Sequence, residues 1–90
     1  MKYDLRAPQI SVTVDGPSTL VWQSGDEGTP WLKLVVRLAQ GGNERLIKLG
    51  RRGLSGHVRL KLPAGRWHAA LFASNSAGKV RYVPLGVLPR

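Results

Sequence analysis

Residues 62–78 read LPAGRWHAALFASNSAG, from Leu62 to Gly78. Pro63 and Gly65 mark a turn at the start of this stretch, and a polar turn that ends in glycine closes it. Between the turns, apolar residues recur at every second position: Trp67, Ala69, Leu71 and Ala73. A strand with one buried face has this period of two, because successive side chains point to opposite faces. The stretch therefore predicts a turn, a half-buried strand and a second turn.

The rest of the chain repeats this pattern of short alternating segments separated by turn residues. The expected strands cover residues 8–14, 18–23, 31–40, 44–49, 57–62, 67–73 and 79–86. Residues 50–53, with the sequence Gly-Arg-Arg-Gly, are expected to form a loop. The apolar positions that fall in phase predict a buried core of Trp22, Leu34, Val36, Val58, Leu60, Trp67 and Leu71. Seven short strands without a helical apolar period predict an all-β fold, a seven-stranded antiparallel β-sandwich, as a single domain over residues 1–90.

Three local features resemble a fibronectin type III domain. Leu20-Val21-Trp22 resembles the second strand of that family, which ends in a core tryptophan. Leu62-Pro63 followed by Trp67 resembles the corner before the sixth strand, and Asn75-Ser76-Ala77-Gly78 resembles the turn after it. The resemblance covers nearly the whole chain and implies a fibronectin type III-like sandwich of Greek-key topology.

One residue at the corner departs from the family pattern. The family usually places tyrosine where this chain has Trp67, and the tyrosine hydroxyl normally bonds back to the backbone. An indole N–H could make a similar bond with altered geometry, or the corner could simply be packed. Neither alternative changes the expected fold.

Charge is distributed unevenly over the 90 residues, whose net charge is +9. Residues 31–90 carry twelve of the fourteen lysines and arginines but only one of the five acidic residues, Glu44. This asymmetry suggests an acidic protein or another anionic polymer as partner, and the alternative is charge that serves only solubility. The candidate anion-facing residues are Arg51, Arg52, Arg59 and Lys61. Because the strands that bear the outward cations belong to different sheets, the sequence disfavours nucleic-acid binding.

The sequence offers little for catalysis, so we expect no enzymatic activity. His57 and His68 fall on strands expected in opposite sheets, and no third ligand or orienting carboxylate is apparent near either. No phosphate-binding loop or nucleophile motif is present. The longest apolar-rich stretch, residues 31–38, is interrupted by two cations and is too short to span a membrane. We therefore predict no catalytic residues, no cofactor, no metal and no membrane span.

One outward-facing position points to a protein contact. If Trp67 and Leu71 point into the core, Phe72 must point away from it, because side chains alternate along a strand. The candidate contact residues are Trp31, Val35, Ala70 and Phe72. An exposed patch of this kind commonly marks a protein interface. The alternatives are scattered exposed residues, or a Phe72 side chain covered by residues 83–88.

The resemblance implies a non-enzymatic module that binds other protein subunits of a larger assembly. The chain begins with Met1 and the expected strands nearly fill it, which suggests a complete small gene product. Stand-alone domains of this type look like bacteriophage virion components, such as tail accessory or capsid decoration proteins. Such a protein would be made in the host cytoplasm and reside in the virion. The alternative is a glycan-binding or spacer module from a bacterial extracellular enzyme or adhesin.

Overall fold

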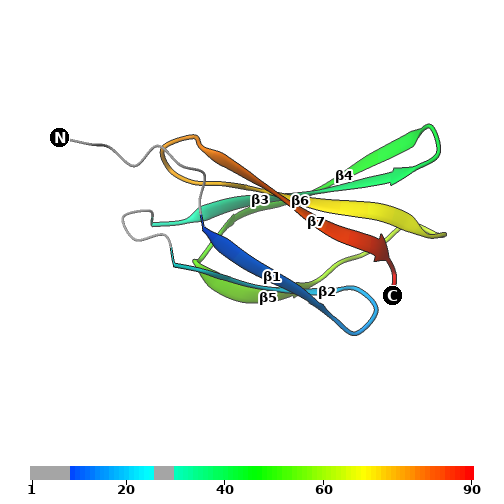
Figure 1. Cartoon of the computed structure of the whole chain (residues 1–90), viewed down its shortest axis with the longest axis horizontal. Helices are drawn as coiled ribbons and strands as arrows, with labels where there is room; N and C mark the ends of the chain where they lie inside the picture. Colours follow the sequence, from blue (N-terminus) through cyan, green and yellow to red (C-terminus); the bar gives the residue numbers. More distant parts are fainter. Residues whose placement is uncertain (1–8, 26–29) are drawn as a thin grey trace.

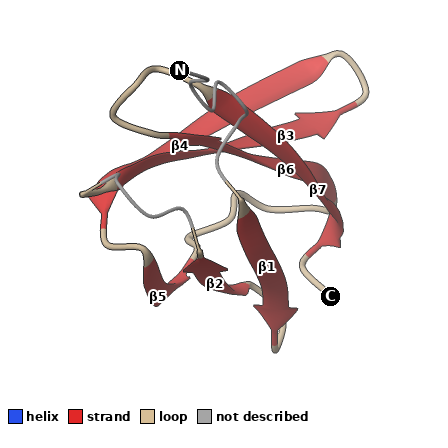
Figure 2. Cartoon of the chain, turned by 60° about the vertical axis from the view of Figure 1, so that its left-hand side comes forward, coloured by secondary structure: helices blue, strands red, loops and turns tan. Residues whose placement is uncertain are grey.

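Two antiparallel β-sheets make up the regular structure in the computed structural model, which describes residues 9–25 and 30–90. The strands are β1 (Ile10–Asp15), β2 (Thr19–Ser24), β3 (Leu32–Gln40), β4 (Asn43–Arg52), β5 (Ser55–Arg59), β6 (Trp67–Ser74) and β7 (Val80–Leu88). One sheet has the order β1-β2-β5 and the other β4-β3-β6-β7. The sheets form two layers (Figure 1; Figure 2). The all-β class and the two antiparallel sheets predicted from the sequence are confirmed.

The core lies between the layers and follows the predicted alternation. Leu34, Val36 and Leu38 project inward from β3 and are completely buried. Of the seven predicted core residues, six are buried. The exception is Val58, which is half-buried and packs against the core from β5. Because β5 is an edge strand of its sheet, one side of this residue lacks a neighbouring strand.

Both edge strands of the four-stranded sheet contain a β-bulge. Leu49 in β4 and Leu85 in β7 have no cross-strand Cα partner, so each is the additional residue of its bulge. A glycine with positive φ follows each of them, Gly50 at 72° and Gly86 at 80°. Glycine adopts this left-handed conformation without the steric cost that a Cβ would impose.

The bulge in β4 corrects the prediction of a loop at residues 50–53. The structure places Gly50, Arg51 and Arg52 within β4, so that interpretation is wrong for three of the four residues. The bulge accommodates Gly50 inside the ladder, and pairing with β3 then continues to Arg52. The predicted strand at residues 57–62 is also displaced, because β5 covers Ser55–Arg59 and Leu60 lies in the connection to β6.

Two indole side chains anchor connecting segments to the core. The Trp67 N–H donates to the carbonyl oxygens of Pro63 at 3.3 Å and Ala64 at 3.2 Å. Of the two alternatives at this corner, the structure therefore has the backbone hydrogen bond. The Trp22 N–H donates to the carbonyl oxygen of Gly53 at 3.0 Å, which fixes the segment between β4 and β5.

Asn75 organises the turn between β6 and β7. Its Oδ1 accepts hydrogen bonds from the backbone N–H groups of Ala77 and Lys79, both at 3.0 Å. Its own backbone N–H donates to the Lys79 carbonyl, and its carbonyl accepts from Gly78, also at 3.0 Å. Asparagine suits this position because its short side chain can replace backbone partners within a turn.

Replacing Asn75 tests this role. Asn75→Ala removes the acceptor for two backbone donors and is expected to lower the free energy of unfolding by about 1–2 kcal/mol. Asn75→Asp keeps an oxygen at the same position and is the matched control, expected to lose less. Urea titrations followed by tryptophan fluorescence give both values. Equal stability of Asn75→Ala and the parent chain would contradict the proposed role of the side chain.

Candidate functional site

Val35 and Phe72 lie side by side on the face of the four-stranded sheet that points away from the core, here called the outer face. They are cross-strand partners between β3 and β6. Their chain neighbours Val36 and Leu71 are completely buried, so the alternation of a strand sends Val35 and Phe72 outward. Both side chains are half-buried rather than fully exposed. The sequence therefore predicted their direction correctly.

A tyrosine from β7 completes this group. Tyr82 is the cross-strand partner of Phe72, and the two ring centroids are 5.3 Å apart with an interplanar angle of 59°. This tilted arrangement is a favourable aromatic geometry. Residues 83–88 were the segment expected to cover Phe72 if it formed no contact surface. The observed ring contact comes instead from the residue just before that segment.

The other two candidate contact residues contribute less exposed surface. Ala70 is only 7% exposed, and its cross-strand partners are Arg37 and Pro84. Trp31 precedes β3 and is half-buried. The guanidinium carbon of Arg51 lies 4.3 Å from the centroid of the Trp31 ring, so a cation–π contact covers part of this indole.

Strand register arranges the outer face in four rows, because cross-strand partners present their side chains on the same face. From β4 to β7 the rows are Arg51-Lys33-Ser74-Val80, Lys48-Val35-Phe72-Tyr82, Leu46-Arg37-Ala70-Pro84 and Glu44-Ala39-His68-Val87. All four cations of these rows lie on β3 or β4. Both aromatic residues lie on β6 or β7. The outer face therefore has a basic half and an aromatic, apolar half.

The apolar half is well exposed. Tyr82 is 56% exposed, Val80 50% and Val87 39%, all from β7. Leu46, 56% exposed, is the large apolar residue on the β4 side. These residues were not among the candidates from the sequence. Alternation within β7 could have identified Tyr82, but only the register of β7 on β6 places it beside Phe72.

The basic half carries four cations, and one of them pairs with a carboxylate within the described residues. Arg37 forms an ion pair with Glu44 at 2.9 Å, with both side chains about half exposed. Lys33, Lys48 and Arg51 have no ion-pair partner among the residues that the structure describes. Exposed pairs such as Arg37–Glu44 add little stability, but this one neutralises one of the four cations of the outer face. The positive potential is therefore centred on the remaining three residues.

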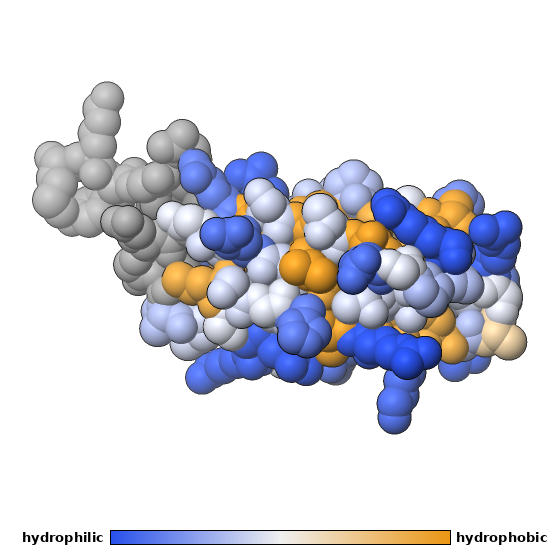
Figure 3. Space-filling view, turned by 90° about the horizontal axis from the view of Figure 1, so that it is seen from below, coloured by the Kyte–Doolittle hydropathy of each residue, from blue (hydrophilic) through white to orange (hydrophobic). Residues whose placement is uncertain are grey.

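The opposite outer face, on the three-stranded sheet, has a different character. Its outward residues are Ser11, Thr13, Asp15, Thr19, Val21, Gln23, Ser55, His57 and Arg59. Val21 is the one large apolar residue in this set. Seen from this side, hydrophobic colour is broken into separate patches among hydrophilic residues (Figure 3). The contiguous aromatic and apolar group is thus a property of the four-stranded sheet.

The four candidate anion-facing residues do not form one patch. Arg51 lies on the outer face of the four-stranded sheet, whereas Arg59 lies on β5 in the other sheet. Arg52 is half-buried and its Nε donates to the Leu49 carbonyl oxygen at 3.1 Å. Lys61 is exposed in the connection between β5 and β6. The structure instead brings Arg51 together with Lys33 and Lys48, neither of which was among the candidate anion-facing residues.

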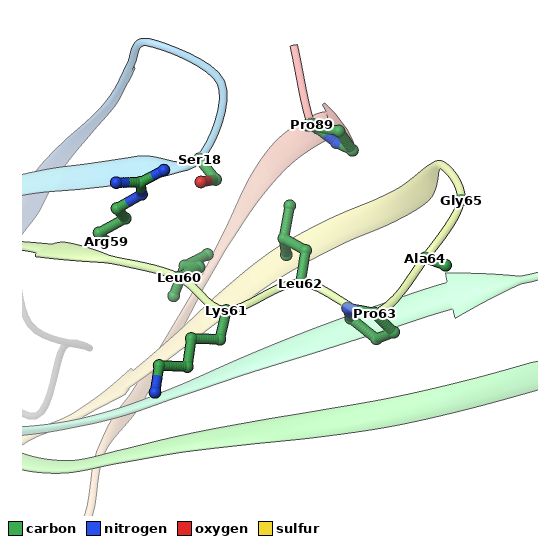
Figure 4. Close-up of a pocket in the computed structure, with 9 residues that line it drawn as sticks. All are labelled: Ser18, Arg59, Leu60, Lys61, Leu62, Pro63, Ala64, Gly65 and Pro89. Atoms are coloured by element: carbon green, nitrogen blue, oxygen red, sulfur yellow. The ribbon is translucent and has the colours of Figure 1, made fainter.

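A groove of about 650 Å³ lies beside the corner before β6. Its lining residues are Ser18, Arg59, Leu60, Lys61, Leu62, Pro63, Ala64, Gly65 and Pro89 (Figure 4). The leucines and prolines make its surface largely apolar, and Arg59 and Lys61 are its charged residues. Neither a carboxylate nor a histidine is among its lining residues.

The potential catalytic side chains do not converge in the described residues. His57 lies on β5 and His68 on β6, in different sheets as the sequence predicted, and both are exposed. No three acidic or histidine side chains of residues 9–25 and 30–90 form a group that could hold a metal ion. Across the same residues, no helix is long and apolar enough to cross a membrane. The chain matches no protein-family model, no curated protein and no solved structure.

Proposed function

We propose that the protein is a non-enzymatic module that presents the outer face of its four-stranded sheet to another protein subunit in a larger assembly. The observation that carries this proposal is the exposure of Tyr82, Val80 and Val87 on one strand, beside Phe72. Large apolar side chains gathered on one face are typical of protein interfaces, whereas isolated ones are not. On the matching face of the other sheet, Val21 is the one large apolar residue exposed among the residues that the structure describes.

We further propose that the fold is of the fibronectin type III type, with Greek-key connections. The division into β1-β2-β5 and β4-β3-β6-β7 supports this assignment. The bond from Trp67 to the Pro63 and Ala64 carbonyls also supports it. That bond has the same purpose as the tyrosine hydroxyl bond of the family, since each ties the corner before the sixth strand to the strand itself.

The absence of enzymatic activity remains part of the proposal. Its support is the separation of the titratable side chains that could cooperate. The histidines His57 and His68 lie on different sheets, and the Glu44 carboxylate is ion-paired with Arg37, two strands away from His68. Acid–base or nucleophilic catalysis needs two such groups within hydrogen-bonding reach of one substrate.

The setting that we propose for this module is the bacteriophage virion, as an accessory or decoration component of a tail or capsid. The support is the fold resemblance, which is an analogy and not a property of the site. A glycan-binding module is the alternative from the sequence. Protein surfaces that bind sugars commonly present aromatic rings with open faces. Here Arg51 covers part of the Trp31 ring, and the Phe72 ring packs against Tyr82. The arrangement of these rings therefore favours a protein partner.

Site-specific photo-crosslinking in the cells that produce the protein tests the proposal. A photo-reactive phenylalanine at position 82 is expected to give one predominant crosslinked protein, because Tyr82 stands at the centre of the apolar half. The same probe at position 21 is the matched control on the opposite face. In purified assemblies, Tyr82→Asp is expected to reduce incorporation at least about tenfold, as for a buried aromatic anchor of an interface.

Two results would contradict the proposed function. One is equal crosslinking from positions 82 and 21, and the other is normal incorporation of a folded Tyr82→Asp protein. Tyr82 is a better position for this test than Phe72, which is half-buried and packs against Tyr82. An aspartate at position 72 would destabilise the sheet itself, so that loss of incorporation would have two explanations.

A further inference from the structure

We propose that the outer face selects an acidic, amphipathic protein segment, with its carboxylates on the basic half and its apolar side chains on the aromatic half. This inference rests on the proposed function for the use of the face, and it adds the chemistry of the partner. It follows from the register that places Lys33, Lys48 and Arg51 on one side of Phe72 and Tyr82.

The basic half is suited to carboxylates. Lys48 and Arg51 lie on β4, and Lys33 lies opposite Arg51 on the neighbouring strand β3. The contact with Trp31 restrains the Arg51 guanidinium. A guanidinium that contacts an aromatic ring through its face still has its N–H groups in its own plane. These N–H groups can donate to a carboxylate in a bidentate fashion.

The apolar half provides the complementary contact. Phe72 and Tyr82 form its centre, and Val80 extends it along β7. Burying one such aromatic or aliphatic side chain contributes roughly 1.5–3 kcal/mol. Charge alone would attract many anionic molecules, so this half would discriminate in favour of a segment that carries apolar side chains as well.

The dimensions of the face agree with an α-helix that lies along the strands. Three interstrand spacings separate β4 from β7, which amounts to about 14 Å. An α-helix with its side chains is about 10–12 Å wide. A helix with acidic residues along one side and leucines along the other would therefore reach both halves at once.

The charge distribution argues against two other occupants. A second copy of this chain would set Lys33, Lys48 and Arg51 against either the same three cations or the apolar half, and each chain has a net charge of +9. For single-stranded nucleic acid, stacking needs ring faces that are open to the bases. Here the Phe72 and Tyr82 rings are tilted against each other at 59° rather than arranged as parallel platforms, and the four cations of the outer-face rows are confined to β3 and β4.

The test is a binding titration of the whole chain with designed probes. The first probe is a fluorescein-labelled helical peptide of about 20 residues, with glutamates on one side and leucines on the other. The second is a scrambled peptide of the same composition, and the third is a single-stranded DNA of about 20 nucleotides. Fluorescence anisotropy is recorded at about 0.05 M and about 0.3 M NaCl. At the higher concentration, salt screens the interaction between charges that are more than a few ångströms apart.

Paired charge variants separate specific contacts from general attraction. Lys33→Gln with Lys48→Gln removes two cations from the outer face, and Arg59→Gln with Lys61→Gln removes two cations elsewhere. We expect the first pair to weaken amphipathic peptide binding about tenfold or more at low salt, and the second pair less than about threefold. Tyr82→Ser is expected to weaken it at both salt concentrations, because its contribution is apolar.

Three outcomes would overturn the inference. One is equal affinity for the amphipathic and scrambled peptides. Another is an equal loss of amphipathic peptide affinity in the two double charge variants. The third is DNA binding that is tighter than peptide binding and depends on Lys33 and Lys48, which would make the face a nucleic-acid surface. If position 82 still crosslinks to a protein while the amphipathic peptide fails to bind, the proposed function stands and only this inference falls.

Discussion

Trp67→Ala is expected to lower the free energy of unfolding by about 3–5 kcal/mol, the usual cost of removing a large aromatic side chain from a core. Trp67 is only 4% exposed, and its N–H holds the Pro63 and Ala64 carbonyls at the corner before β6. The substitution therefore removes both core volume and the tie between the corner and the sheet. Domains of this size are stable by only about 5–15 kcal/mol, so the substitution is expected to remove a large part of the total stability.

Trp67→Phe separates the two contributions. It keeps a ring in the core and removes the indole donor, so we expect a smaller loss of about 1–2 kcal/mol. Denaturant titration followed by circular dichroism gives both values. Fluorescence is less suitable, because both variants lose one of the three tryptophans and keep only Trp22 and Trp31. A Trp67→Ala protein whose stability lies within about 1 kcal/mol of the parent would show that neither the packing nor the corner bond matters.

Trp22→Ala is expected to have an effect of similar size, about 3–5 kcal/mol. Trp22 is 3% exposed, and its indole occupies the space over Gly56, its cross-strand partner on β5. A Cβ at position 56 would lie 2.9 Å from Trp22 Cζ2. Gly56→Ala alone is therefore expected to cost about 1–3 kcal/mol through overpacking. Gly42→Ala, where no atom lies within 4 Å of the added Cβ, is the matched control.

A double-mutant cycle checks this contact directly. In a Trp22→Leu background the smaller side chain leaves room at position 56, so Gly56→Ala is expected to cost less than it does in the parent. The coupling between the two positions should reach at least about 1 kcal/mol, well beyond what independent sites show. If the changes in unfolding free energy caused by the two substitutions are additive, contact with the Trp22 indole is not the reason that position 56 requires glycine.

Alternation of apolar residues predicted the strands and most of the core, because local sequence determines which face of a strand is buried. Leu34, Val36 and Leu71 were placed inside on this basis, and all three are completely buried. The loop predicted at residues 50–53 was wrong because a bulge is a property of two strands. Gly50 reads as a turn residue in the sequence, and only its pairing against β3 shows that the strand continues through it.

The sequence predicted only part of the candidate site, because the site also depends on how neighbouring strands pair. Alternation sends Phe72 outward, and it also sends Val35 outward on the neighbouring strand. The partner of Phe72 on the other side depends on how the turn between β6 and β7 aligns the two strands, and the bulge at Leu85 shifts the register farther along, where Val87 pairs with His68. The grouping of Lys33, Lys48 and Arg51 likewise depends on the bulge in β4. Counting charges along the sequence does not show which cations lie next to one another in the sheet.

The glycine bulges have a consequence for how the molecule behaves at high concentration. A sheet that ends in a regular strand offers unpaired backbone donors and acceptors on which a further copy can add, and repeated addition produces fibrils. Here both ends of the four-stranded sheet are irregular, at Gly50 in β4 and at Gly86 in β7, and Pro84 adds a residue without an N–H. Continuous strand addition is thereby interrupted at each end. The chain can thus expose an apolar face to a partner while the edges of the same four-stranded sheet discourage open-ended polymerisation with copies of itself.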